Sequence, residues 1–369
     1  MPGGVQWVPA IRVIVLSNLI AMRINTLLAL LSLLVSARAD RIVLVAGGAR
    51  DATGVPALEA ALKEPFGTEF DTAGNTWIVE MVSGNRLLKV DASGLLTHAA
   101  GQLKAGFSGD GGPALQAQFN GPHNLAVLPG GDILIGDTWN GRVRKVDVKT
   151  GIVSTLPGWQ APEGRERGNG PYCITLSPDK TKLHIADLRQ VHELDLVTGK
   201  SRVVAGNGKK GVPEDGALAV EAPLADPRAA AMDSQGNLYV LERNGNALRV
   251  VGRDGRIRTV VNASGKKGGD GDGGSALDAS MSGPKHLCVD RDDSVLIADA
   301  ESHLIRRYVP ATGRIERIAG TGKKGAAGVG GDPLQCELAR PHGVTIHPRT
   351  GELFITDSYN NRVLKIVRE

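Results

Sequence analysis

The stretch 107–147, FSGDGGPALQAQFNGPHNLAVLPGGDILIGDTWNGRVRKVD, opens with a Gly-Asp-rich run whose residue types could do chemistry. The N–H groups of a glycine-rich loop can hold phosphate, and carboxylates such as Asp110 offer oxygens to Ca²⁺. A phosphate loop also needs a preceding strand, a following helix and a placed lysine, and the flanking sequence supplies none of these. Apolar runs separated by Pro-Gly-Gly and Asn-Gly predict short strands and tight turns instead. We therefore expect the Gly-Asp run to be a connector.

The same pattern recurs six times along the chain, at intervals of about 50 to 57 residues. A proline precedes the first apolar run of each unit, at Pro65, Pro122, Pro171, Pro227, Pro284 and Pro341. An acidic residue ends the second run, at Glu80, Asp137, Asp187, Glu242, Asp299 and Asp357. Four short strands in each period are typical of a propeller blade, in which repeated sheets surround a central axis.

The last unit ends after three apolar runs, whereas RIVLVAGG at 41–48 is similar to the other fourth strands and has no first strand before it. The sequence therefore predicts an all-β, six-bladed β-propeller of four-stranded antiparallel blades, closed by an N-terminal strand that completes the last blade. The predicted blades lie near 62–101, 119–157, 170–206, 224–262, 281–320 and 338–369 plus 41–47.

The repeats resemble the NHL-repeat family of six-bladed β-propellers. The resemblance rests on the Gly-Asp-Gly-Gly-Pro-Ala loop, the Pro-His dipeptides, the GNLYV-like second strand and the DTWNGRVRKV and DSYNNRVLKI turns. It covers nearly all of 40–369 and implies the fold. It implies little about function, because propellers support binding, scaffolding, hydrolysis and lyase chemistry.

The first 39 residues differ in kind, since they contain three arginines and no acidic residue or lysine. A positive start, the apolar run INTLLALLSLLV and the small-residue end SARA predict a secretory signal peptide, and hence a secreted or periplasmic protein. The alternative is a membrane anchor over 11–35, but Arg23 divides it into halves shorter than the roughly 20 residues that span a bilayer. Removing three of the 43 basic residues leaves them nearly balanced by 39 acidic ones, so net charge predicts no partner.

Residues that directly follow the six prolines should line one mouth of the central channel. They are Phe66, His123, Tyr172, Arg228, Lys285 and His342. Amidating lyases, which share this propeller, hold zinc with three Pro-His histidines in alternate blades, and the resemblance matches His123 and His342 to two of them. Arg228 occupies the third position and has no lone pair for a metal. His286, two residues past its proline, is expected to point away from the channel.

Lactonase-type propellers bind calcium at the channel with carboxylate and Asn oxygens. PYCITLSPDKTKLHIAD resembles their strand pair, but Tyr172 and Cys173 replace the oxygen donor and its glycine. We therefore predict no metal and no other cofactor. Three cysteines without metal-ligand spacing indicate free thiols.

The loops GNGKKG, ASGKKG and GTGKKG repeat a lysine pair in front of the last three blades. The six lysines are Lys209, Lys210, Lys266, Lys267, Lys323 and Lys324. They form either a solvated rim or a docking surface for an anionic partner, such as an acidic glycan, an anionic envelope surface or an acidic protein patch. The signal peptide argues against nucleic acid as the partner.

Two functional hypotheses follow from these patterns. The first is a secreted, monomeric binding or scaffold module that holds a protein or an anionic glycan on its loop face. The alternative is a metal-dependent lyase or lactonase-type enzyme with its site at the channel mouth.

Overall fold

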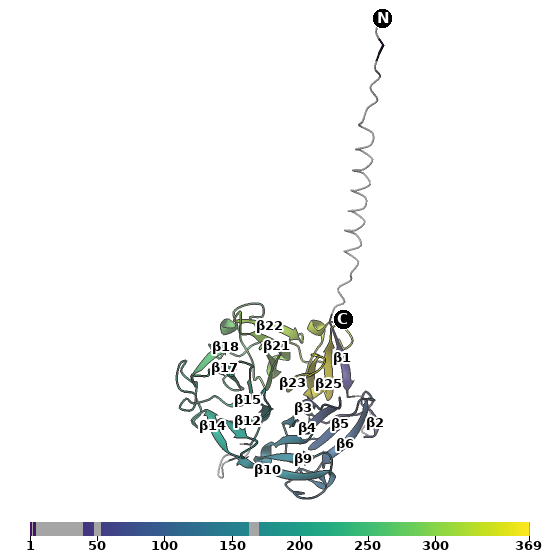
Figure 1. Cartoon of the computed structure of the whole chain (residues 1–369), viewed down its shortest axis with the longest axis vertical. Helices are drawn as coiled ribbons and strands as arrows, with labels where there is room; N and C mark the ends of the chain where they lie inside the picture. The colour runs from purple at the N-terminus through teal and green to yellow at the C-terminus, as the bar shows by residue number, and fades with distance from the viewer. Residues whose placement is uncertain (2, 5–39, 48–52, 162–169, 369) are drawn as a thin grey trace. The chain divides into compact units, whose positions relative to one another are not determined.

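The computed structural model describes residues 1, 3–4, 40–47, 53–161 and 170–368. Residues 40–367 form one compact unit, a ring of six antiparallel sheets around a central axis (Figure 1). The predicted signal peptide lies outside the described residues. Within the described part of the chain, no helix has the length and apolar character needed to cross a bilayer.

The first three blades follow one another along the chain. Blade 1 contains β2 (Val55–Pro56), β3 (Pro65–Phe70), β4 (Thr76–Glu80), β5 (Arg86–Val90) and β6 (Leu95–Gly101). Blade 2 contains β7 (Asn124–Val127), β8 (Ile133–Asp137), β9 (Arg142–Asp147) and β10 (Ile152–Gln160). Blade 3 contains β11 (Cys173–Leu176), β12 (Lys182–Ala186), β13 (Val191–Asp195) and β14 (Ser201–Ala205). The two-residue strand β2 pairs with β6 and makes blade 1 five-stranded.

The other three blades complete the ring. Blade 4 contains β15 (Pro227–Met232), β16 (Leu238–Glu242), β17 (Ala247–Val251) and β18 (Ile257–Val261). Blade 5 contains β19 (His286–Val289), β20 (Val295–Asp299), β21 (Leu304–Val309) and β22 (Arg314–Ala319). Blade 6 contains β23 (Gly343–Ile346), β24 (Leu353–Asp357), β25 (Arg362–Val367) and β1 (Arg41–Ala46).

Six short 3₁₀ helices lie in the connections of the described chain. Three precede first strands: η1 (Ala114–Gln116), η3 (Ala276–Asp278) and η5 (Pro333–Gln335). Three separate second from third strands: η2 (Thr138–Asn140), η4 (Ala300–Ser302) and η6 (Ser358–Asn360). Each of the latter ends in a left-handed residue, at Gly141, His303 and Asn361, which reverses the chain into the third strand.

Alternation along the inner strands separates the core from the channel. Leu125, Leu287 and Val344, each three residues past its proline, are fully buried and pack between adjacent sheets. The even-numbered positions after the prolines point the other way, toward the axis. Because both faces of every sheet are covered by neighbouring blades, apolar burial holds the blades together.

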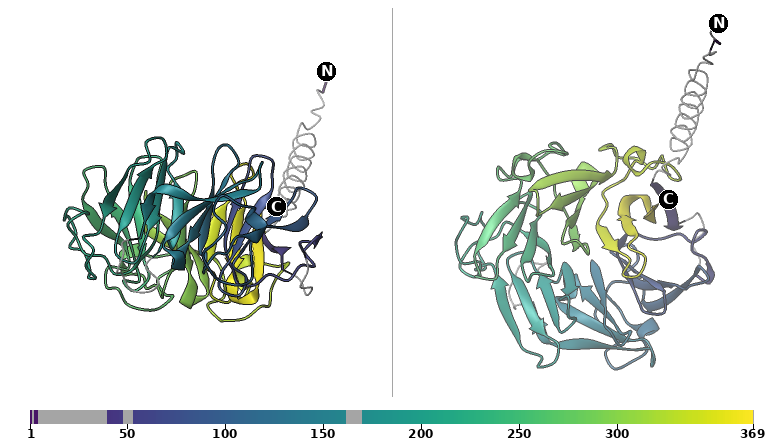
Figure 2. Two further views of the ribbon diagram at one scale, coloured as in Figure 1. Left: turned by 90° about the horizontal axis from the view of Figure 1, so that it is seen from below. Right: turned by 45° about the horizontal axis from the view of Figure 1, so that its top comes forward.

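The ring closes through β1, which pairs antiparallel with β25 from Arg41 opposite Val367 to Ala46 opposite Val363. Figure 2 shows this N-terminal strand beside the C-terminal strands of blade 6. Ile42 is fully buried in the core of that blade. The predicted closure is therefore confirmed, and it leaves β25 with a partner on both sides.

Deleting 40–46 should expose the edge of β25 and open the ring. We expect aggregation, or a melting temperature lower by roughly 10 °C or more, because the deletion exposes both an unpaired strand edge and a face of the hydrophobic core to solvent. Circular dichroism melting against a control chain that starts at residue 40 measures this. An unchanged melting temperature in the shortened protein would contradict closure by β1.

Candidate functional site

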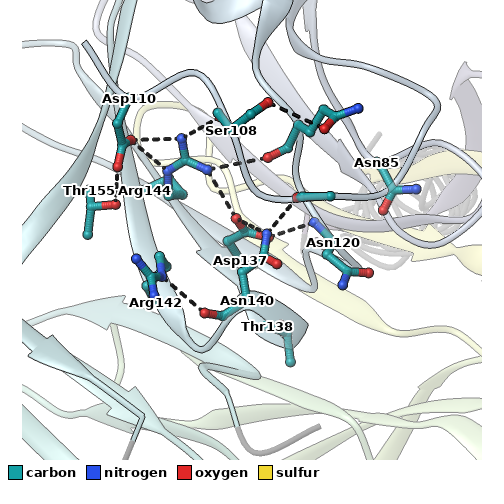
Figure 3. Close-up of polar contacts among 12 residues, drawn as sticks. Asn85, Ser108, Asp110, Asn120, Asp137, Thr138, Asn140, Arg142, Arg144 and Thr155 are labelled. Atoms are coloured by element: carbon teal, nitrogen blue, oxygen red, sulfur yellow. Dashed lines mark hydrogen bonds and ion pairs between the residues drawn. The ribbon is translucent and has the colours of Figure 1, made fainter. Parts of the chain in front are cut away.

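In five of the six blades, a buried carboxylate at the end of the second strand fixes the loop that enters the channel-lining strand. In blade 2, Asp137 Oδ1 accepts the N–H of Asn120 at 2.7 Å, and Oδ2 contacts Asn140 Nδ2 at 2.8 Å and Arg144 Nη1 at 3.3 Å (Figure 3). Equivalent carboxylate–arginine pairs are Glu80–Arg86, Glu242–Arg249, Asp299–Arg306 and Asp357–Arg362. These repeated acidic residues thus hold the scaffold, because their oxygens are used by backbone N–H and arginine.

The Gly-Asp run is a connector, as its sequence predicts. Asp110 Oδ1 accepts hydrogen bonds from Arg144 Nη2 at 2.8 Å and Nε at 3.1 Å, while Oδ2 accepts from the Thr155 hydroxyl at 2.6 Å (Figure 3). Asp272 repeats the contact with Arg306 at 2.9 Å in blade 5. The aspartates therefore neutralise a buried arginine from the third strand.

The turn into the channel uses an unusual backbone conformation in five blades. The residue before the proline has a positive φ at Glu64, Gly121, Asp226, Gly283 and Arg340. Glycine adopts this conformation freely, whereas a residue with a Cβ does so at a cost of about 1 kcal/mol or more. We call the face that carries the connections from fourth to first strands the loop face. The turn brings the residue after each proline to the mouth of the channel on this face.

The six residues after the prolines meet at this mouth. Ring contacts join Phe66 to His342 (4.0 Å between centroids), Phe66 to His123 (5.2 Å) and His123 to Tyr172 (4.7 Å). The guanidinium carbon of Arg228 lies 3.6 Å from the Tyr172 ring centroid. Burial, and then the charge of Lys285, lowers the pKa of His342.

Both mouth histidines are neutral acceptors. His123 Nδ1 lies 2.8 Å from the carbonyl oxygen of Gly121, and His342 Nδ1 lies 2.8 Å from that of Arg340, so each Nδ1 carries the proton and donates it. Burial lowers the pKa of both imidazoles well below the usual value, and the charges of Arg228 and Lys285 lower it further. Each Nε2 therefore keeps its lone pair at neutral pH.

Two buried cations lie beside these imidazoles. Arg228 is 7% exposed, and its Nη1 has no hydrogen-bond partner within the described chain. The side chain of Lys285 is 8% exposed, and its Nζ is 3.6 Å from Glu301 Oε1. Burial, then the charge of Arg228, lowers the pKa of Lys285 to about 7, and burial lowers that of Arg228 to about 10. Burying a cation with an unused donor costs free energy, and a negatively charged group at this position would offset that cost.

The surrounding charges do not neutralise the pair. Asp226 is engaged by Arg243, and Glu301 is engaged by Arg340. Among the described residues, blades 4 to 6 therefore contribute four basic side chains to the mouth against these two carboxylates. They are Arg228, Arg243, Lys285 and Arg340. The mouth carries excess positive charge where its side chains are buried.

Arg228 occupies a position that a zinc site would need for a histidine. His123 and His342 both contact Phe66, and the guanidinium, which cannot ligate zinc, lies at the position where the third lyase histidine would be. Across the described residues, no group of three or more His, Cys, Asp or Glu side chains has metal-binding geometry. The residues present do not fit a three-histidine zinc site.

The expectation that His286 points away from the channel is wrong. Its ring lines the channel, and its Nε2 lies 3.1 Å from Nδ2 of Asn124 in the opposite blade. Regular pairing starts at the second residue after the proline, with His286 opposite Ala298 and Asn124 opposite Gly136. Alternation counted from that residue places even positions inward, while the residue after the proline reaches the axis from the turn.

All six lysines of the repeated pairs are exposed, in the loops between fourth and first strands. Their backbones are held by local contacts, such as Lys209 N to Asn207 Oδ1 at 2.9 Å and Lys323 N to Thr321 Oγ1 at 3.2 Å. Within the described chain none of the six ammonium groups lies within 4 Å of a carboxylate. We call Lys209, Lys210, Lys266, Lys267, Lys323 and Lys324 the basic crescent.

Sequence reasoning missed a cavity at the other end of the channel. It has a volume of about 700 Å³ and is lined by the inner strands of all six blades together with the turns that follow them. It opens on the hairpin face, which carries the turns between first and second strands. The even-numbered positions after the prolines would have revealed its lining, had alternation been counted from the second residue.

Comparison with known proteins supports the repeat family. A model of the Teneurin NHL domain matches residues 172–270, and the NHL repeat matches 119–146 and 338–366. Among curated proteins, Suppressor of quenching 1, chloroplastic, of Arabidopsis thaliana is 26% identical over 267 residues. That match covers 67% of this chain and 25% of the relative, so the chain spans about a quarter of that protein's length.

Solved structures share the ring at low sequence identity. An auxiliary nutrient binding protein from Bacteroides thetaiotaomicron is 14% identical with a TM-score of 0.64, covering 89% of this chain and 77% of that one. Virginiamycin B lyase from Staphylococcus aureus is 13% identical with a TM-score of 0.53, covering 83% and 97%. Identities this low establish the fold alone. The repeat matches and the six-bladed ring together show that the chain belongs to the NHL-repeat β-propeller family.

The depressed pKa of Lys285 makes stability depend on pH in a defined direction. Between pH 7 and about 10.5 the unfolded chain holds this proton and the folded chain does not, so stability rises with pH over that window. Lys285→Met should therefore be more stable than the wild type at pH 6.5, with the difference shrinking toward pH 10. Thermal melts across this range measure it, with exposed Lys323→Met as control. Parallel pH profiles for wild type and Lys285→Met would rule out a depressed Lys285 pKa.

Proposed function

We propose that this protein is an extracytoplasmic binding module that holds an acidic glycan on the loop face of its propeller. The observation that carries the proposal is the buried pair Arg228 and Lys285, which presents an unused guanidinium donor and excess positive charge at the channel mouth. A carboxylate is the ligand group that satisfies a guanidinium donor and an ammonium together.

The groups around the pair favour a sugar acid. Trp139 and Tyr359 are partly exposed on η2 and η6 and contact the rings of His123 and His342. Such rings offer apolar faces with polar edges, which suits the mixed surface of a sugar ring. The neutral Nε2 atoms of the histidines accept hydrogen bonds from hydroxyl groups. A terminal uronic acid residue at the mouth would contact the two cations with its carboxylate, the aromatic rings with its sugar ring, and the histidine Nε2 atoms with its hydroxyl groups.

The basic crescent extends this site outward for a polymer. Its lysine pairs lie ahead of three successive blades, and the loops that hold them lead along the chain into the mouth residues of blades 4 to 6. Exposed charges strengthen capture of an anionic chain and respond to salt, because screening acts over about 8 Å at physiological ionic strength. The likeness to an auxiliary nutrient binding protein, together with the signal-like leader, supports a location outside the cytoplasm.

The rival function, a metal-dependent lyase or lactonase-type enzyme, rests on the two mouth imidazoles and the shared fold of virginiamycin B lyase. Zinc or calcium retained at about one ion per chain after dialysis would favour it. Arg228 counts against it, because its charge repels a divalent cation at the same mouth.

Changing all six lysines of the basic crescent to Gln should weaken binding of oligogalacturonate by about tenfold or more at low salt, since each exposed ion pair contributes about 0.2–1 kcal/mol. Wild-type binding should also fade between 50 and 500 mM NaCl. Isothermal titration calorimetry provides the measurement. Melting temperatures should stay the same, because exposed lysines bury little surface.

The matched control changes Lys149, Lys200 and Arg253 to Gln, in exposed turns on the hairpin face, and should leave affinity within about twofold. Arg228→Gln should weaken a single galacturonate as well as the oligomer, because it removes the mouth contact. If polyglutamate or anionic vesicles bind as tightly as the oligogalacturonate, the partner is not a glycan. Equal glycan binding by wild type and the six-Gln variant would refute the crescent.

A further inference from the structure

The cavity on the hairpin face is separated from the loop-face mouth by a bond across the channel. Asn124 Oδ1 accepts the N–H of Ile174 at 3.0 Å, so its Nδ2 faces His286 Nε2 at 3.1 Å and donates to it. His286 Nδ1 then donates to the carbonyl oxygen of Val344 at 3.1 Å. Burial lowers the pKa of His286 to about 4, which keeps the ring neutral in this role. The cavity is therefore a site of its own.

One carboxylate lies inside this cavity, at Glu69 on β3. The other charged lining residues lie on the turns at the cavity's rim: Asp71, Lys180, Asp290, Arg291, Asp293 and Arg349. Within the described chain, the carboxylate of Glu69 has no cation within 4 Å. It thus presents a carboxyl group, without a direct counterion, to the interior of a cavity of about 700 Å³.

Two threonines in the cavity add acceptors. Thr175 donates its hydroxyl to the carbonyl oxygen of Ala230 at 2.6 Å, and Thr345 donates to that of Thr68 at 3.0 Å. With their protons used, the lone pairs of both oxygens remain for a ligand. Glu69, Thr175 and Thr345 hold the same position, four residues past the proline, in blades 1, 3 and 6, of which blades 6 and 1 are neighbours in the ring. The oxygen atoms of these three side chains are therefore available as hydrogen-bond acceptors.

The remaining wall is apolar. Ala126, Ala231 and Leu128 line it together with Met232 and Cys288. Burial raises the pKa of the Cys288 thiol, so this sulfur is protonated and packs as an apolar group. An ammonium group has three donors and no acceptor, which complements a carboxylate and two hydroxyl oxygens.

We propose that the hairpin-face cavity binds an organic primary ammonium ion, with the ammonium at Glu69, Thr175 and Thr345 and the carbon skeleton against the apolar wall. Nothing in the acidic-glycan site is needed for this binding, because the Asn124–His286 bond lies between the two. The cavity volume admits a compact amine of up to drug-like size.

The charge state of Glu69 makes this binding depend on pH. Burial raises the pKa of Glu69 to about 7, and the charge of Lys180 lowers it in part. The other titratable groups facing Glu69 are the Cys173 and Cys288 thiols, whose pKa values it helps to raise, and neutral His286; Asp71 and Asp290 lie at the rim. Alkylammonium ligands stay charged below pH 9, so Glu69 ionisation is the step that controls affinity between pH 5.5 and 8.5.

Calorimetry with 2-phenylethylammonium and cyclohexylammonium chloride tests the proposal. At pH 8.5 both should bind the wild type, and affinity should fall roughly tenfold or more by pH 5.5 as Glu69 takes up a proton. The uncharged analogues 2-phenylethanol and N-acetyl-2-phenylethylamine should bind at least tenfold more weakly. Glu69→Gln should lose the preference for the amine and the dependence on pH.

Two further variants keep the outcome decisive. Glu316→Gln, an exposed acid on the outer strand β22, should bind the amines like the wild type. Ala231→Leu, which fills the wall of the cavity, should weaken both amines while its circular dichroism spectrum stays native. Oligogalacturonate binding should be unchanged in Glu69→Gln, so failure of one site is distinguishable from failure of the other. Absence of binding by either amine, or undiminished amine affinity in Glu69→Gln, would overturn the proposal.

Discussion

The central channel exists because β1 pairs with β25. The ring is closed only when the first strand of the chain completes the last blade, and this pairing joins the two ends of 40–367. Closure fixes how many inner strands surround the axis and hence how near their side chains approach. The contact between Phe66 of blade 1 and His342 of blade 6 spans the seam directly, so the mouth cannot form without it.

Buried carboxylates transmit this geometry to the channel. In five of the six blades, Asp137 and its counterparts accept the N–H of a residue ahead of the channel-lining strand and also hold an arginine from the third strand. Losing one partner would leave a buried charge, which costs several kcal/mol. The residues after the prolines are consequently presented from rigid turns, and the unsatisfied donor of Arg228 is held in place by its surroundings.

The two ends of the channel carry opposite chemistry. The loop-face mouth gathers donors and positive charge at Arg228 and Lys285, whereas the hairpin-face cavity gathers acceptors around Glu69. His286 and Asn124 separate them with a hydrogen bond between opposite blades. We propose a different ligand for each end, a polymer at the mouth and a small molecule in the cavity, and the two proposed sites share no residue.

The sequence was sufficient to predict the ring and its closure. Prolines and acidic residues at a constant phase predicted each blade, and the apolar run at 41–48 predicted closure, because burial repeats wherever a blade repeats. The direction of His286 and the cavity around Glu69 were missed for one reason. Strand pairing starts at the second residue after the proline, not at the first, and in blade 1 it starts after a bulge between Pro65 and Gly67. A shift of one residue reverses which side chains face the axis. Nothing in the local residue types marks that shift.

A crystal structure of the protein soaked with galacturonate examines the loop-face site most directly. We expect the carboxylate within hydrogen-bond distance of Arg228 Nη1 and Lys285 Nζ, with the sugar hydroxyls toward the Nε2 atoms of His123 and His342. Galacturonate bound elsewhere, or Arg228 Nη1 bonded to a protein oxygen with no ligand at the mouth, would contradict it.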